Sequence, residues 1–105
     1  MDNVRIASML LKLQMDDLKD ADMLTTYAMN IANEGDTNIA TALYARAKAR
    51  LNHVEEDKRT IESVMMRAEQ EAAMNGTPMN TSDVYAKITK DYVDEWEEKI
   101  RRKMM

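Results

Sequence analysis

The only histidine of the chain and the acidic residues near it are the side chains best suited to chemistry. His53 is followed by Glu56 three residues later and by Asp57 at the next position. Asp17 lies eighteen residues before Gly35, and His53 lies eighteen residues after it. If two antiparallel helices meet at Gly35, Asp17 and His53 lie at the same level between them. Imidazole and carboxylate groups that face each other in a helical bundle can bind a metal ion, so the candidate metal ligands are Asp17, His53 and Glu56.

A structural interpretation fits the same part of the chain. Arg50 precedes His53 by three residues, so the two share a helix face. The Arg50 guanidinium group can pair with Asp17 or Asp57 and so neutralise a polar layer between the helices. The predicted members of this layer are Gln14, Asp17, Arg50, His53 and Asp57. In this interpretation His53 is a hydrogen-bonded interhelical residue, and the layer fixes the register of the helices.

Other catalytic patterns are weak or absent in the sequence. The chain has one histidine and no cysteine, so it has neither a thiolate nucleophile nor a thiolate metal site. No serine stands in a nucleophile turn. Gly35 and Gly76 are isolated, so no glycine-rich loop can hold a phosphate group. The residues therefore favour a non-enzymatic protein.

The composition favours helices throughout one domain. The 105 residues include two Gly, one Pro and no Phe, and they are rich in residues that lose little side-chain freedom in a helix. We predict a single all-α domain over residues 1–105, in which an antiparallel helical hairpin is followed by a third helix. The helices are expected at about residues 3–33, 37–74 and 83–103.

Local signals mark where the predicted helices end. Gly35 is expected to end the first helix, and Asp36 is expected to cap the second. The second helix should end at residues 75–78, which read NGTP, because Pro cannot continue the hydrogen-bond ladder. Thr81 or Ser82 is predicted to cap the third helix. The third helix is shorter than the second and leaves apolar surface uncovered, so we expect dimerisation to complete the bundle.

One stretch of the chain has the features of a known family. From residue 27 to residue 54 it reads YAMNIANEGDTNIATALYARAKARLNHV. Its features are the Glu34-Gly35 turn, the Ile39-Ala40 start of the second helix, Ala47 and the closing His53-Val54 pair. In this order and spacing the stretch resembles the hairpin of rubrerythrin-type members of the ferritin-like superfamily, and the resemblance extends over roughly residues 10–61.

The resemblance implies a bundle in which two hairpins enclose a di-iron or similar centre. Each hairpin of that family supplies a Glu from its first helix and a Glu-x-x-His pair from its second. By position, the first Glu falls on Asp17, the His falls on His53, and the Glu of the pair falls on Arg50. An Arg cannot ligate a cation, and it places a fixed positive charge where two metal ions would sit. The chain therefore departs from the family at a residue that the centre needs.

Charge and hydropathy restrict the partners of the chain. The net charge is −4, which disfavours binding to nucleic acid. No apolar run approaches the roughly 20 residues that span a bilayer, and no signal peptide is recognisable. We therefore expect a cytoplasmic protein without a membrane partner.

Two functions follow from these observations. The preferred one is a non-enzymatic protein-interaction module on a degenerate ferritin-like scaffold, which binds no cofactor, forms a homodimer and contacts another protein. Its small size and acidic charge also suit a phage or mobile-element accessory protein that binds a host protein. The alternative is a ferritin-like metal-binding protein or oxidoreductase, in which Asp17, His53 and Glu56 of two chains form a reduced site for iron, manganese or zinc.

Overall fold

The molecule consists of three long helical rods. The computed structural model describes residues 2–105. The first two rods are α1 (Asn3–Asn33) and α2 (Thr37–Met74). The third rod joins α3 (Thr81–Ile88), a π-helical turn η1 (Thr89–Val93) and α4 (Asp94–Lys103). Residues 2–105 contain no strand, which confirms the predicted all-α class.

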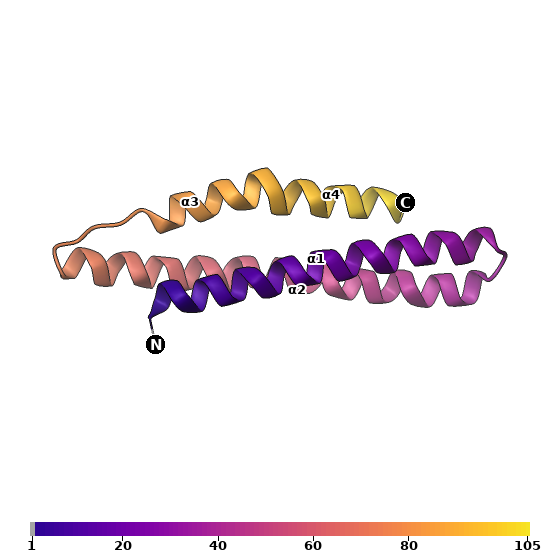
Figure 1. Ribbon diagram of the computed structural model, residues 1–105, viewed down its shortest axis with the longest axis horizontal. Coiled ribbons are helices and arrows are strands. Elements are labelled where there is room, and N and C mark those ends of the chain that lie inside the picture. The colour runs from indigo at the N-terminus through magenta and orange to yellow at the C-terminus, as the bar shows by residue number, and fades with distance from the viewer. Residues whose placement is uncertain (1) are drawn as a thin grey trace.

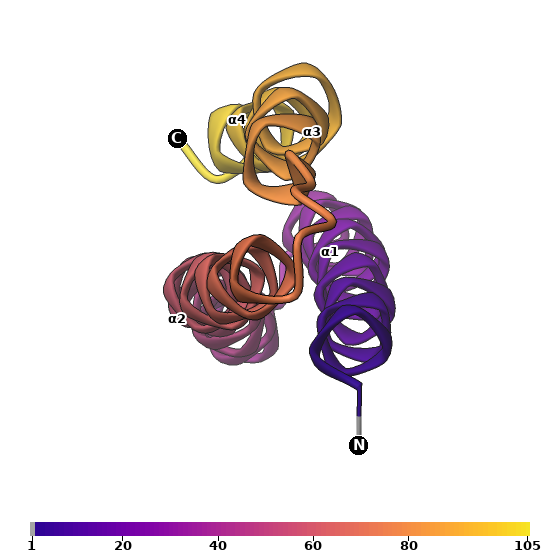
Figure 2. The same ribbon diagram turned by 90° about the vertical axis from the view of Figure 1, so that its left-hand side faces the viewer.

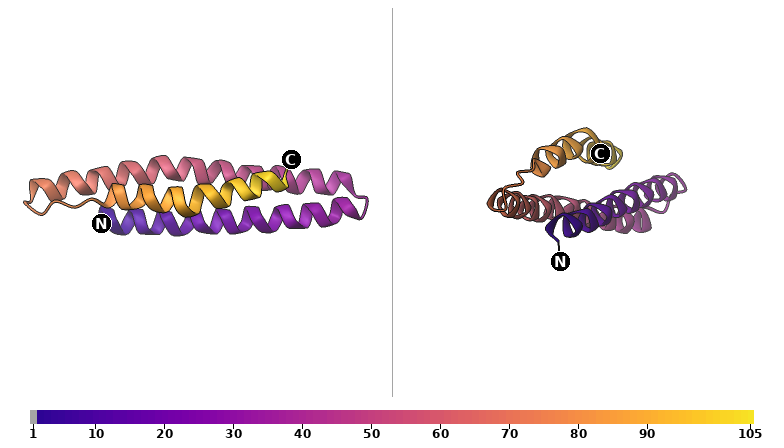
Figure 3. Two further views of the ribbon diagram at one scale, coloured as in Figure 1. Left: turned by 90° about the horizontal axis from the view of Figure 1, so that it is seen from above. Right: turned by 60° about the vertical axis from the view of Figure 1, so that its left-hand side comes forward.

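The third rod lies over the line along which the two helices of an antiparallel hairpin meet. α1 and α2 form the hairpin, and the third rod runs back over both of them, parallel to α1 (Figures 1 and 3). Seen end-on, the three rods occupy the corners of a triangle (Figure 2). The molecule measures 62 × 24 × 14 Å. Because the third rod is the shortest, the tip of the hairpin projects beyond the C-terminus (Figure 1).

The tight turn of the hairpin follows from local sequence. Gly35 has φ +99°, a conformation that glycine adopts without strain. The N–H groups of Gly35 and Asp36 donate to the carbonyls of Ala32 and Ile31 at 3.0 and 3.2 Å, which is the Schellman pattern. The Asp36 carboxylate then accepts from the N–H of Ile39 at 3.1 Å. The predicted helix end and the predicted cap are both confirmed.

The start of the third rod differs from the prediction. The helix begins at Thr81, and neither Thr81 nor Ser82 acts as its cap. A carboxylate oxygen of Glu69, on α2, instead accepts from the backbone N–H of Ser82 at 2.6 Å. A negative charge at a helix N-terminus satisfies a free donor and complements the helix dipole. A residue of another helix has therefore replaced the local cap, which is why the predicted cap and the start at residue 83 were wrong.

The π-helical turn explains how one face of the third rod stays on the hairpin. Tyr85, Thr89, Val93 and Glu97 are all buried, and each follows the previous one by four residues. In a regular α-helix of 3.6 residues per turn, three such steps would rotate the face by about 120°. The i→i+5 bonding of the π turn widens the helix and removes this drift. The prediction of one uninterrupted α-helix in this region was therefore wrong, because a π-helical turn divides it.

Two apolar clusters form the core. One lies beneath α4 and the other beneath α3. The first comprises Leu18, Ala21, Leu51, Val54, Val93 and Ile100, and the second comprises Ala7, Ile61, Val64 and Tyr85. Each cluster contains residues of all three rods, so burial of apolar surface holds the third rod to the hairpin.

Candidate functional site

Gln14 joins the three rods through its side-chain amide. Its side chain is fully buried. The Gln14 amide nitrogen donates to the backbone carbonyl of Val54 at 3.0 Å, and its amide oxygen accepts from the Tyr85 hydroxyl at 3.2 Å. Burial raises the pKa of Tyr85. Gln14 was a predicted member of the layer, whereas Tyr85 was not, because its place opposite Gln14 depends on how the third rod packs.

Arg50 and Asp17 form an ion pair across the hairpin. Arg50 Nη1 lies 3.5 Å from Asp17 Oδ1. The Asp17 side chain is 17% exposed, while that of Arg50 is 45% exposed, so the pair lies at the edge of the interface. The structure therefore pairs Arg50 with Asp17, one of the two carboxylates that the sequence offered.

The remaining predicted residues of the polar layer and metal site lie further out. His53 and Glu56 are exposed on α2, and Asp57 is half-buried. Burial, and then the charge of Asp17, raise the pKa of Asp57, while the charge of His53 acts in the opposite direction. Asp17, His53 and Asp57 are thus close enough to interact through their charges.

The residues do not fit the two-metal centre that the resemblance implies. The guanidinium group of Arg50 stands at the position of a ligand, and it already pairs with Asp17, the position of another. Within residues 2–105, no three His, Asp or Glu side chains are arranged to hold a metal ion. A reduced site made of Asp17, His53 and Glu56 stays a prediction.

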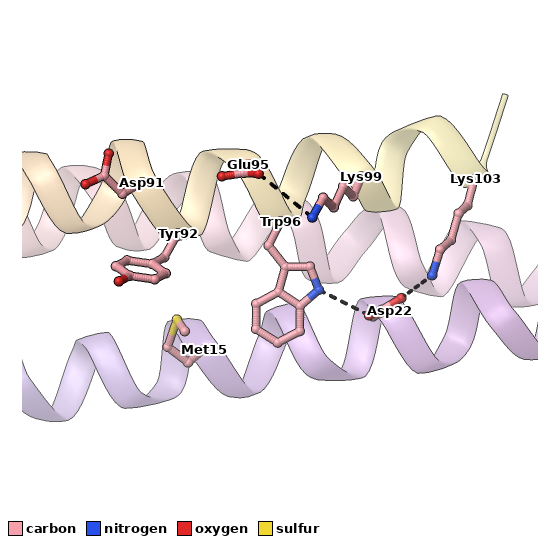
Figure 4. Close-up of a pocket in the computed structure, with 8 residues that line it drawn as sticks. All are labelled: Met15, Asp22, Asp91, Tyr92, Glu95, Trp96, Lys99 and Lys103. Atoms are coloured by element: carbon pink, nitrogen blue, oxygen red, sulfur yellow. Dashed lines mark hydrogen bonds and ion pairs between the residues drawn. The ribbon is translucent and has the colours of Figure 1, made fainter.

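A groove with a volume of about 530 Å³ lies between α1 on one side and η1 and α4 on the other (Figure 4). The indole N–H of Trp96 donates to Asp22 Oδ2 at 3.1 Å, and Lys103 Nζ lies 2.6 Å from Asp22 Oδ1. The hydrogen bond with Lys103 lowers the pKa of Asp22 most strongly. The residues that line the groove are Met15, Asp22, Asp91, Tyr92, Glu95, Trp96, Lys99 and Lys103.

The groove continues past Trp96 into a second hollow of about 400 Å³, toward the tip of the hairpin. Tyr92, on one side of Trp96, is 65% exposed, and Tyr27 and Met23, on the other side, are 52% and 48% exposed. Large apolar side chains therefore flank a partly buried tryptophan. We call this surface the Trp96 face, and define it by Met15, Lys19, Met23, Tyr27, Asp91, Tyr92, Glu95, Trp96, Lys99 and Lys103.

The opposite side of α4 carries a charge cluster that binds α2. Lys58 Nζ lies 2.6 Å from Asp94, 2.8 Å from Glu55 and 3.4 Å from Glu97. Arg101 also lies 3.3 Å from Glu97. Burial, and then a hydrogen bond to Glu55, raise the pKa of Glu97 to about 7. The hydrogen bonds of Lys58 raise its pKa, although burial opposes this shift. These charges neutralise one another locally, which is typical of a structural cluster.

The sequence contained a signal for the Trp96 face that we did not interpret. Tyr92, Trp96, Lys99 and Lys103 follow one another at steps of four, three and four, so they share one side of a helix. The neighbouring helix was not evident, because several packings of three helices satisfy the same periodicity.

Two further findings concern membrane spans and similarity to known proteins. No helix in residues 2–105 combines the length and the apolar character that crossing a membrane requires. Known protein families, curated proteins and solved structures gave no match to this chain.

Proposed function

We propose that this chain is a non-enzymatic helical module that binds protein through the Trp96 face. The observation that carries the proposal is the grouping of half-exposed Tyr92, Met23 and Tyr27 around the groove that contains Trp96. Aromatic residues and Met are enriched at the centres of protein interfaces, where charged residues form the rim. The Trp96 face has this composition.

The hydrogen bond of Trp96 also supports the proposal. Asp22 accepts from the indole N–H at 3.1 Å, and Asp22 is itself held by Lys103 at 2.6 Å. The indole ring is therefore fixed before a partner arrives, and little side-chain entropy is lost on binding. A degenerate ferritin-like scaffold, used by a phage or mobile-element accessory protein to bind a host protein, is the biological setting that we propose.

Site-specific photo-crosslinking tests the proposal. A benzophenone side chain would replace Tyr92 in the full chain, and the matched control would carry it at Glu98, an exposed α4 position outside the groove of Figure 4. We expect discrete protein adducts after irradiation in cells from position 92 and none from position 98. Equal labelling from both positions, or no adduct from position 92 in a folded variant, would contradict the proposal.

A metal-binding protein is the second candidate. The observation in its favour is that Asp17, on α1, contributes to the raised pKa of Asp57, on α2, beside His53. A bound cation would relieve this repulsion. The test is the metal content of untagged protein and of the His53→Ala variant, measured by mass spectrometry. Stoichiometric iron, manganese or zinc that is lost on the substitution would establish this candidate, whereas metal-free wild-type protein would reject it.

A further inference from the structure

We propose that the partner of the Trp96 face is a second copy of this chain, packed across it in antiparallel orientation about a two-fold axis. This inference rests on the proposed function and identifies the partner. In such an interface the same surface serves both copies, so it must be complementary to itself. The distribution of charge on the Trp96 face meets this requirement.

The charges on this side of the third rod change sign near residue 97, within α4. Asp91, Glu95, Lys99 and Lys103 all line the groove, at intervals of four residues (Figure 4). The first half of the row is acidic and the second half is basic. A two-fold axis near residue 97 would place each Asp91 opposite Lys103 of the other copy, and each Glu95 opposite its Lys99. A parallel arrangement would place like charges together, so the charges favour the antiparallel pair.

The apolar residues of the face suit the same axis. Trp96 lies one residue from the centre of the row, so the two indole rings would meet near the axis. Tyr92 lies further out on the third rod, and Tyr27 lies on α1 beyond Trp96. Aromatic side chains bury about 150–250 Å² each when fully covered. Tyr92, Trp96 and Tyr27, which are already partly covered, would thus contribute on the order of 300 Å² per copy.

This apolar area is small compared with that of a standard interface. Stable complexes bury about 800 Å² on each partner. The charged rim must therefore supply more than half of the contact area. We expect a reversible dimer that dissociates as salt is added, since exposed charge pairs are screened.

Glu95 and Lys99 are the residues best suited to a test. Within one chain they lie 3.8 Å apart, and both side chains are 64% exposed, so their pairing is weak and can be exchanged for a contact between copies. Lys103 is less suitable, because it also holds Asp22. The matched control is Glu98 with Arg102, a pair of the same spacing and exposure that lies outside the Trp96 face.

The experiment is sedimentation equilibrium of the full chain and its charge variants. Wild-type protein should dimerise reversibly. Glu95→Lys and Lys99→Glu should each raise the dimer dissociation constant by on the order of 10-fold, since each places like charges together at two symmetric contacts. The double variant should restore dimerisation.

A mixture of the two single variants should form a heterodimer in preference to either homodimer. Glu98→Lys and Arg102→Glu carry the same changes in net charge, and should dimerise like the wild type.

The emission of Trp96, the only tryptophan, provides a second readout. It should shift to longer wavelength on dilution, as the indole ring of each copy becomes exposed. A chain that stays monomeric, a dimer insensitive to the charge of residues 95 and 99, or mixed variants that do not prefer each other would each overturn the antiparallel dimer. If such a monomer still gave Tyr92-specific adducts with another protein, the proposed function would stand while this inference failed.

Discussion

Two buried threonines differ in the partners of their hydroxyl groups. Thr89 Oγ1, in the π turn, is the one buried side-chain oxygen or nitrogen in residues 2–105 without a hydrogen bond of normal geometry, although it lies near enough to the Tyr85 hydroxyl to oppose the rise in the pKa of Tyr85. The hydroxyl of Thr25, which is fully buried, donates to the carbonyl of Ala21 at 2.7 Å. An unsatisfied buried polar group costs about 1–3 kcal/mol. The shape of threonine can be kept by valine while that cost is removed.

We therefore expect Thr89→Val to raise the free energy of unfolding by about 1 kcal/mol. Thr25→Val is the matched control, and it should lower the free energy of unfolding by about 1 kcal/mol because it removes a satisfied bond. Urea unfolding followed by circular dichroism measures both changes. Equal effects of the two substitutions would contradict the assignment of Thr89 as the unsatisfied residue.

We expect Glu97 to make the attachment of α4 to α2 depend on pH. Its pKa is raised from 4.5 to about 7, so its stabilising contribution is fully present below about pH 4.5 and is lost as the pH rises through 7. The hydrogen bond from Glu97 lowers the pKa of Glu55, so the contribution of Glu55 is lost only below its ordinary value of 4.5. The other charges that face Glu97 are Lys58, Asp94 and Arg101.

We expect the stability of the wild type to fall between roughly pH 5 and pH 8, and Glu97→Gln to flatten this part of the profile. Glutamine keeps the shape and the hydrogen-bonding capacity of the protonated side chain but cannot ionise. Thermal unfolding across this pH range is the measurement, with Glu98→Gln as the exposed control. A slope that survives in Glu97→Gln would assign the titration to another group.

At the scale of the elements, one amide connects the three rods. The side-chain oxygen of Gln14 accepts a hydrogen bond from the Tyr85 hydroxyl, and its side-chain nitrogen donates one to the carbonyl of Val54. We expect Tyr85→Phe to cost about 1 kcal/mol of stability, because it leaves the Gln14 oxygen without a donor. The same substitution should cost less in a Gln14→Ala background, since no acceptor is then left unsatisfied. Urea unfolding of this double-mutant cycle is the measurement. Tyr44→Phe, at a half-buried position of α2, should change stability by less than about 0.5 kcal/mol.

The elements also show what the sequence could predict. α1 and α2 have the predicted bounds, because Gly35 and Asp36 make their bonds to residues nearby in sequence. The start of the third rod was missed, because its N-terminus is satisfied by Glu69 from α2. The π turn was missed for a related reason: the four-residue spacing of its buried side chains has meaning only once the hairpin beneath is known.

The candidate sites also include one part that the sequence predicted and one that it did not. Counting from the turn placed Asp17 at the level of His53, and Arg50, three residues before His53, was predicted to pair with Asp17 or Asp57. In the structure Arg50 and Asp17 lie 3.5 Å apart. The groove around Trp96 requires α1 and α4 to be neighbours, which periodicity within each helix does not specify. Local chemistry was thus predictable from sequence, whereas a surface shared by distant segments was not.

At the scale of the whole molecule, the rods differ in how far they are covered. The third rod ends where Lys103 meets Asp22, so the tip of the hairpin consists of α1 and α2 alone and is not covered by the third rod (Figure 1). Native-state hydrogen exchange should therefore be faster for amides of residues 26–44 than for those of residues 14–21 and 51–58, which lie beneath the third rod. Uniform protection along α1 and α2 would contradict this expectation.

The π turn has a consequence for insertions and deletions. The third rod contains one residue more than a regular α-helix needs to keep Tyr85 and Ile100 on the hairpin. Removing the exposed Lys90 should therefore shorten the chain without turning α4, and the melting temperature should change little. The uninterrupted α2 contains no extra residue of this kind, so removal of the exposed Thr60 cannot be absorbed. It would rotate the following residues by about 100° and should abolish cooperative unfolding. We therefore expect the π turn to tolerate a change in chain length while each face of α4 keeps its neighbours.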